Sequence, residues 1–448
     1  MSTQPLLHNS GGALTRDGSQ IDWSVRTRDL VWVGIFSVLA IGPGVMGYSR
    51  SLAVAEPLIL GLLIWSIARR EARSTPLDLI AGAWLLSEIG STIWSYHSGW
   101  GIHSSYPYDL YAGGYFGPIR LLADTSIAVM GAYTLNWSCR TSASSCNGLR
   151  RIAPILAASI GVVGLCIAEQ LRNMMSGTDD PRIEATFTNP NLLGAFLCIA
   201  LPISAGAAVS SGLSRTAKLG LSILTALLAA SLILTQSRGA ILGCMVATAY
   251  IGASSWVYQA ANGVECARRA VAAVRALAIS CAIIVVCALA IFPRVLHESR
   301  GVSDNQRRTA WIAAIIVIRS QPLTGLGIDG FPAAMESLRL REMNPDTVSG
   351  LPLVPAMHLH AHDLLLQGWV ERGLFGAVTV CGLVALILRR AWTGLAKAGP
   401  RRDTITAGLI GALVATLVQN VTDYTFWYAP IAILFWSTLG LAFAPEPE

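Results

Sequence analysis

The stretch "HLHAHDLLLQGWVERGLFGAVTVCGLVALIL" covers residues 358–388 and joins two kinds of sequence. It opens with alternating histidines and an aspartate, which are side chains that titrate or bind ligands. From residue 364 onward the side chains are mostly apolar, over a length that satisfies the roughly 20 residues of a membrane-spanning helix. The stretch therefore predicts a helix that enters a membrane directly after a polar, titratable cluster.

The whole chain has the composition of a membrane protein. Of its 448 residues, 53% are hydrophobic and 13% are charged. Soluble globular proteins carry about 25% charged residues, so the composition excludes an ordinary soluble protein. We expect an all-α polytopic membrane protein that forms one bundle of many helices.

Twelve segments of the chain are apolar and long enough to be membrane spans. They cover residues 30–48, 52–68, 76–95, 118–138, 151–170, 188–210, 217–236, 239–258, 271–293, 364–388, 404–422 and 426–444.

The spans divide the chain into four parts. We expect a polar tail at residues 1–28 without a cleavable signal peptide, then nine spans within residues 29–293. A long connection at 294–363 follows, and three more spans lie within 364–448. In the long connection, "NQRRTAWIAAIIVIRS" (305–320) has the apolar spacing of an amphipathic helix that lies along a membrane surface.

Lysine and arginine residues gather in alternate short connections, which predicts the orientation in the membrane. The connections expected to be cytoplasmic contain Arg69, Arg70, Arg73, Arg140, Arg150, Arg151, Arg215, Lys218, Arg268, Arg269, Arg389, Arg390, Lys397, Arg401 and Arg402. Both termini are then cytoplasmic, and the long connections face outward. The net charge of +6 thus reflects membrane topology, and we expect no nucleic-acid partner.

Several polar groups converge on the outer face under this topology. They are His358, His360 and His362 before the tenth span, Arg238 in the turn between spans seven and eight, Arg307 and Arg308 in the long connection, and Asn189 and Asn191 at the start of span six. Arginine binds phosphate through a rigid, bidentate, permanently charged fork. Histidine is the usual general acid or base near neutral pH. Together they suit an anionic, lipid-linked substrate whose diphosphate lies at headgroup level.

Other interpretations of the same residues remain open. The three histidines with Asp363 could bind zinc, and Arg238 could reach lipid phosphates as an anchor. The two arginines of the long connection could form a solvated face, and the two asparagines could cap a helix. Glu371 and Arg372 lie about two turns inside the tenth span, where we expect them to face the bundle and pair with other groups.

Four segments in this order carry a resemblance to a known family. They read "TFTNPNLLGAFL" (186–197), "SRGA" (237–240), "RRTAWIAAIIVIRSQPLTGLGIDGF" (307–331) and "HAHDLLLQGWVERGLFG" (360–376). Together they resemble the O-antigen ligase and polymerase superfamily of membrane glycosyltransferases. The matching positions of the last segment are His362, Leu366, Glu371, Gly373 and Gly376. Asp363 stands where the family usually has asparagine.

The resemblance implies a lipid-linked glycosyltransferase bundle (GT-C-like) that works without a metal or other cofactor. It implies transfer of a glycan from undecaprenyl diphosphate to an acceptor hydroxyl, with inversion, at the periplasmic face of the bacterial inner membrane. His362, or His360, would be the catalytic base. Arg238 and Arg307 would bind the diphosphate, with Arg308 as the substitute for Arg307. Asn189 and Asn191 would line the site.

The resemblance leaves several functions to be distinguished. The first is an O-antigen ligase, whose acceptor is a sugar of lipid A-core. The alternatives within the superfamily are an O-antigen or exopolysaccharide polymerase and an O-linked protein oligosaccharyltransferase. A transporter of lipid-linked glycans is the alternative from another class. It would need charged groups in the middle of several spans, and Glu88, Asp124 and Glu371 are the clearest of these.

Overall fold

The computed structural model describes residues 23–69, 74–99, 117–141, 148–176, 182–187, 189–260, 300–342, 360–396 and 404–444. All regular secondary structure within these residues is helical. The helices are α1 (Trp23–Met46), α2 (Tyr48–Ala68), α3 (Asp78–Ser98), α4 (Gly117–Thr141), α5 (Gly148–Ser176), α6 (Pro190–Ala208), α7 (Arg215–Thr235), α8 (Arg238–Ala260), α10 (Arg300–Ser320), α11 (Phe331–Glu342), α12 (Leu364–Ala396), α13 (Thr404–Gln419) and α14 (Ala429–Ala442).

The chain is an all-α, multi-pass membrane protein. Seven of the described helices, namely α1, α2, α5, α6, α7, α8 and α12, are long and apolar enough to cross a membrane, and α13 and α14 are shorter apolar helices. Helices occupy eleven of the twelve segments expected to be spans. The remaining one, residues 271–293, lies outside the described residues, as does most of the predicted tail. The division into four parts stays a prediction.

The centre of the bundle is built from α6, α13 and α14, whose side chains are buried almost throughout. Small residues let these helices approach their neighbours closely, as is usual in membrane bundles. A Cβ atom on Gly243 of α8 would lie 2.3 Å from the carbonyl oxygen of Ala415, and one on Gly440 of α14 would lie 2.2 Å from that of Ala132. The backbone of α13 therefore lies in close contact with that of α8, and the backbone of α14 with that of α4.

One end of the bundle is rich in arginine. Arg151 Nη2 donates a hydrogen bond to the carbonyl oxygen of Leu441 at 3.0 Å, and Arg390 Nε donates one to that of Ala442 at 3.2 Å. At the same end, Arg150 at the start of α5 forms an ion pair with Asp29 of α1. Arg151 and Arg390 thus cap the C-terminal end of α14, where backbone carbonyl groups lack helical partners.

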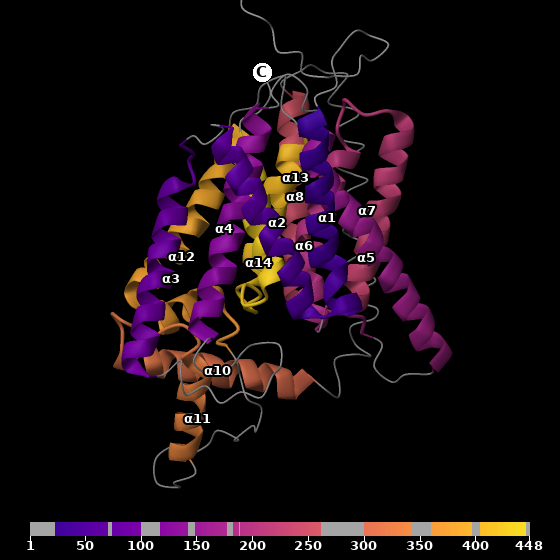
Figure 1. Cartoon of the computed structure of the whole chain (residues 1–448). Helices are drawn as coiled ribbons and strands as arrows, with labels where there is room; N and C mark the ends of the chain where they lie inside the picture. The colour runs from indigo at the N-terminus through magenta and orange to yellow at the C-terminus, as the bar shows by residue number, and fades with distance from the viewer. Residues whose placement is uncertain are drawn as a thin grey trace, which may run out of the picture.

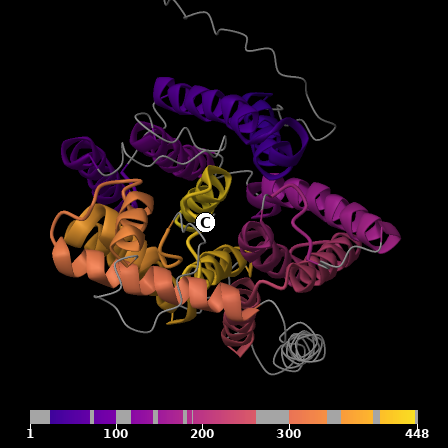
Figure 2. The same ribbon diagram turned by 90° about the horizontal axis from the view of Figure 1, so that it is seen from below.

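The opposite end carries α10, which runs across the ends of the bundle helices (Figures 1 and 2). Ala310, Ala314 and Val317 on its inner face are buried in a small core with Phe331 and Val370. Ile315 and Ile316, by contrast, are exposed. The predicted amphipathic helix at residues 305–320 is thus confirmed as a helix, and it lies beside the start of α12.

Candidate functional site

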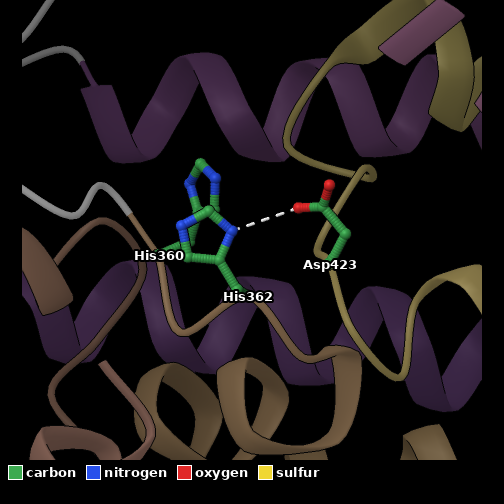
Figure 3. A group of neighbouring side chains, drawn as sticks. All are labelled: His360, His362 and Asp423. Atoms are coloured by element: carbon green, nitrogen blue, oxygen red, sulfur yellow. Dashed lines mark hydrogen bonds and ion pairs between the residues drawn. The ribbon is translucent and has the colours of Figure 1, made fainter. Parts of the chain in front are cut away.

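His360, His362 and Asp423 meet at this end of the bundle (Figure 3). The Nδ1 atom of His362 lies 3.2 Å from Oδ1 of Asp423. The imidazole rings of His360 and His362 are 4.9 Å apart between centroids and meet edge to face. His360 and Asp423 are buried, and His362 is about one quarter exposed. The cluster therefore offers one partly accessible imidazole backed by a buried carboxylate.

Hydrogen bonds from backbone N–H groups hold the chain segment that carries the histidines. The N–H of Ala361 donates to Oε1 of Gln367 at 2.6 Å, and the N–H of Leu364 donates to the carbonyl oxygen of Asn420 at 2.9 Å. Between them, His362 has φ of 50°, a left-handed conformation that is uncommon outside glycine. Such strain is kept where the surroundings impose it, and it is enriched at functional sites.

Asp363 ends this segment by capping α12. Its Oδ1 atom accepts a hydrogen bond from the N–H of Leu366 at 2.8 Å, which is the contact of an N-cap residue. Burial raises the pKa of this carboxyl group, and the backbone hydrogen bonds oppose that shift. The hypothesis that Asp363 joins the histidines as a metal ligand is therefore not supported by the geometry. The carboxylate that lies close to both histidines is that of Asp423.

The turn between α13 and α14 presents Asp423 to the histidines. Asn420 stabilises this turn, because its Oδ1 accepts from the N–H of Thr425 at 2.9 Å and its Nδ2 donates to the carbonyl oxygen of Thr416 at 2.8 Å. Asp423 Oδ1 also accepts from the N–H of Tyr424 at 2.8 Å. The carboxylate is thus fixed by its own turn before it meets His362.

An aromatic wall backs His360. Its ring stacks on Trp427 with centroids 5.1 Å apart and an interplanar angle of 26°, and Tyr424 lies edge-on at 5.9 Å. Tyr424 directly follows Asp423 in the sequence, and Trp427 lies four residues after it. The same turn therefore provides both the carboxylate and the surface against which His360 packs.

The electrostatic surroundings of Asp423 bring Arg307 into the site. Burial raises the pKa of the Asp423 carboxyl group, but its hydrogen bond with His362 and attraction to His362 and Arg307 outweigh this effect. The net pKa is lowered, so the group is ionised at neutral pH. Arg307, two turns into α10, is half-buried, whereas Arg308 is exposed. Of the two arginines, Arg307 is the one whose charge acts on Asp423.

Arg238 is the first residue of α8 and is exposed at the same end of the bundle. The following residue, Gly239, packs against the turn that holds Asp423. A Cβ atom on Gly239 would lie 2.5 Å from Oγ1 of Thr422. The backbone of Arg238 therefore lies beside this turn, and its role in binding a diphosphate stays a prediction.

Asn189 and Asn191 begin α6 next to the same turn. The side chain of Asn189 caps the helix by accepting from the N–H of Asn191 at 2.7 Å, which confirms the capping interpretation for Asn189. Nε2 of Gln419 donates to the carbonyl oxygen of Asn191 at 2.8 Å. These contacts join α6 to the end of α13. A direct role of either asparagine in lining the site stays a prediction.

Glu371 and Arg372, the two charged residues inside α12, face the bundle and pair with other groups, as expected. Arg372 Nη1 lies 2.9 Å from Oε1 of Glu88 on α3, and both side chains are buried. The guanidinium group also lies over the ring of Trp84, 4.5 Å from its centroid. Oε1 of Glu371 accepts from the N–H of Asp329 at 3.1 Å. His358 lies outside the described residues.

Asp423 is the residue that sequence reasoning missed. It is not among the four segments that carry the resemblance, and it lies in a short turn between two apolar segments. A signal was nevertheless present, because the predicted topology places this turn on the outer face with the histidines. An acidic side chain in a short outer turn is a candidate partner for a titratable cluster at the same depth.

Comparison with known proteins gives one finding that bears on function. Residues 223–381 match a family model described as O-antigen ligase. The matched region runs from the middle of α7 into α12 and includes Arg238, Arg307, His360 and His362. No curated protein matches the chain.

Proposed function

We propose, from the premise that residues 223–381 carry an O-antigen ligase family domain, that this protein is an inverting glycosyltransferase. It moves a polysaccharide from undecaprenyl diphosphate to a hydroxyl group of a lipid A-core sugar at the periplasmic face of the bacterial inner membrane. The observation that carries the proposal is the contact between His362 and the buried Asp423, with Arg307 beside them.

His362 acts as the general base. In the tautomer whose Nδ1–H donates to the Asp423 carboxylate, Nε2 carries the lone pair that takes the proton. As the acceptor oxygen attacks the anomeric carbon, its proton passes to Nε2 and the bond from carbon to diphosphate oxygen breaks. The imidazolium ion that forms is stabilised by the negative charge of Asp423. No metal takes part.

His360 supports this assignment through its different surroundings. It is buried and stacked on Trp427, whereas His362 is partly exposed and contacts the carboxylate. A base must reach the acceptor hydroxyl directly or through one water molecule. His362 meets that requirement better, and His360 is the second candidate.

The arginines neutralise the leaving group. Undecaprenyl diphosphate departs with negative charge that increases in the transition state, and guanidinium groups stabilise such charge by bidentate hydrogen bonds. Arg307 is suited to this role because it lies close enough to influence Asp423. Arg238 lies beside the turn that holds Asp423. Arg308, which is more exposed, is the substitute for Arg307.

A gene deletion tests the proposal. Surface lipopolysaccharide from the deletion strain, separated on a gel, should lose its ladder while lipid-linked polymer accumulates. A core bearing a single repeat unit would identify a polymerase instead, and an unchanged ladder with altered glycoproteins would identify a protein transferase.

Complementation of the same strain tests the base. His97→Ala, which alters an exposed histidine outside the cluster, should restore the ladder. His362→Ala should not restore it, although the variant inserts in the membrane at the normal level. A full ladder with His362→Ala would refute the assignment.

A further inference from the structure

We infer that His360, His362 and Asp423 also form a binding site for a zinc-like divalent metal ion, and that the bound ion inhibits glycan transfer. The inhibitory effect rests on the proposed function, because it assumes that His362 is the base. The metal site itself rests only on the geometry of the three side chains.

The three side chains already lie at distances that a metal ion can bridge. Each offers one ligand atom, and these atoms all lie within 4.8 Å of one another. Two donors bound tetrahedrally to zinc at about 2.0–2.1 Å are separated by about 3.4 Å. The 3.2 Å between Nδ1 of His362 and Oδ1 of Asp423 is close to that value. The ligand atom of His360 lies within 4.8 Å of the other two, and the set is complete when these separations close to about 3.4 Å.

The chemistry of the donors selects the class of metal. Two imidazoles and one carboxylate suit Zn²⁺ and its neighbours Co²⁺, Ni²⁺ and Cu²⁺, whereas Mg²⁺ and Ca²⁺ prefer all-oxygen sites. Three protein ligands leave a fourth position open to water.

Arg307 opposes the binding of a cation. Its positive charge acts on Asp423, so it reduces the affinity of the site for any metal ion. The arrangement favours reversible occupation, which is the behaviour of a regulatory or inhibitory site.

Occupation by metal removes the groups that the reaction needs. A metal ion on Nδ1 of His362 leaves the ring proton on Nε2, and that atom then has no lone pair to accept a proton. The ion also takes the Asp423 carboxylate, which would otherwise stabilise the imidazolium ion. Metal binding and base catalysis are therefore mutually exclusive.

A spectroscopic titration tests the site without reference to activity. Metal-free, full-length protein in detergent is titrated with Co²⁺, whose visible absorption reports tetrahedral coordination by nitrogen and oxygen, and Zn²⁺ is then added to displace it. We expect the band in the wild type and in His97→Ala. We expect its loss in His360→Ala, His362→Ala and Asp423→Ala. An equal band in all variants, or no band in the wild type, would overturn the site.

A transfer assay then tests inhibition. After treatment with a chelator the wild type should remain active, and Zn²⁺ should inhibit it while Mg²⁺ at the same concentration does not. In His360→Ala the zinc concentration that halves the variant's own metal-free rate should rise at least tenfold. Activity that is lost on chelation and restored by zinc would overturn both the inhibition and the metal-free mechanism. A wild type that transfers no glycan under any condition would refute the proposed function, while the cobalt band would still report the site.

Discussion

Asp423 combines burial, ionisation and a contact with a partly exposed histidine. An isolated carboxylate in such a place would be costly, and here its neighbours offset that cost. The position of the carboxylate also determines which imidazole nitrogen carries the proton. At the scale of single residues, the site therefore depends on a partner that lies 61 positions away in the chain.

Replacing this carboxylate by its amide should damage catalysis while leaving the shape of the site intact. Asp423→Asn removes the negative charge that stabilises the imidazolium ion and no longer selects the correct tautomer. We expect the turnover number to fall by about 10²-fold to 10⁴-fold, measured with purified protein and lipid-linked donor.

Asp363→Asn is the matched control, because asparagine is as good a helix cap as aspartate. It should retain near wild-type turnover. Equal turnover in the two variants would contradict the role of Asp423.

Replacing Arg238 or Arg307 by lysine keeps the positive charge but removes the bidentate guanidinium fork. Hydrogen bonds to charged groups contribute about 1.5–3 kcal/mol, so Arg238→Lys and Arg307→Lys should each raise the KM for the donor by about tenfold or more. Steady-state kinetics with varied donor concentration measure this effect.

Arg172→Lys, an exposed arginine near the end of α5, is the control and should leave the KM unchanged. A larger effect from Arg308→Lys than from Arg307→Lys would exchange the roles of those two residues.

At the scale of elements, a break in α12 joins the arginine-bearing α10 to the histidines. Gly373 has φ of 61° and interrupts the helix. Upstream of it, the carbonyl oxygens of Val370 and Glu371 accept from the N–H groups of Leu326 and Gly327 at 2.8 and 2.9 Å. The connection after α10 thus replaces hydrogen bonds of the helix and binds α10 firmly to α12.

A side chain at this break should disturb the junction. In Gly373→Ala the new Cβ atom would lie 2.0 Å from the carbonyl oxygen of Leu323, at a backbone conformation that favours glycine. We expect a loss of about 1–3 kcal/mol of stability from the conformational strain alone, seen as a lower melting temperature in detergent.

Gly90→Ala on α3 is the control, because nothing lies within 4 Å of the added atom. It should be neutral or slightly stabilising, since alanine favours a helix more than glycine does. Equal melting temperatures for the two variants would show that the junction tolerates rearrangement.

At the scale of the whole molecule, the two ends of the bundle are chemically different. Arginines bind the carbonyl groups at one end, and the histidine cluster, α10 and the turn holding Asp423 lie at the other. Positive charge near short connections marks the cytoplasmic side. The cluster should therefore face the periplasm.

Two serine-to-cysteine substitutions test this orientation in a background without the nine native cysteines. Ser320 ends α10, Ser211 lies in the connection between α6 and α7 at the other end, and both are exposed. A thiol reagent that does not cross the inner membrane should label Ser320→Cys in intact spheroplasts. Ser211→Cys should be labelled only after permeabilisation. The reverse pattern would invert the topology.

The sequence by itself determined the positions of most membrane segments and which side chains are chemically suited to the reaction. Apolar length is a local property set by bilayer thickness, so eleven of the twelve predicted segments coincide with described helices. The arginines and histidines were recognisable because their residue types suit a diphosphate and a proton, and the predicted topology placed them on one face.

Only the tertiary structure decided which of these groups meet. The contact between His362 and Asp423, the stacking of His360 on Trp427 and the proximity of Arg307 depend on how α10, α12 and the turn after α13 pack together. Helix packing is set by small residues and backbone contacts across the bundle, and neither hydrophobic periodicity nor charge counting encodes it locally. For that reason the sequence places a carboxylate in the turn between two apolar segments, but only the structure shows that it contacts His362.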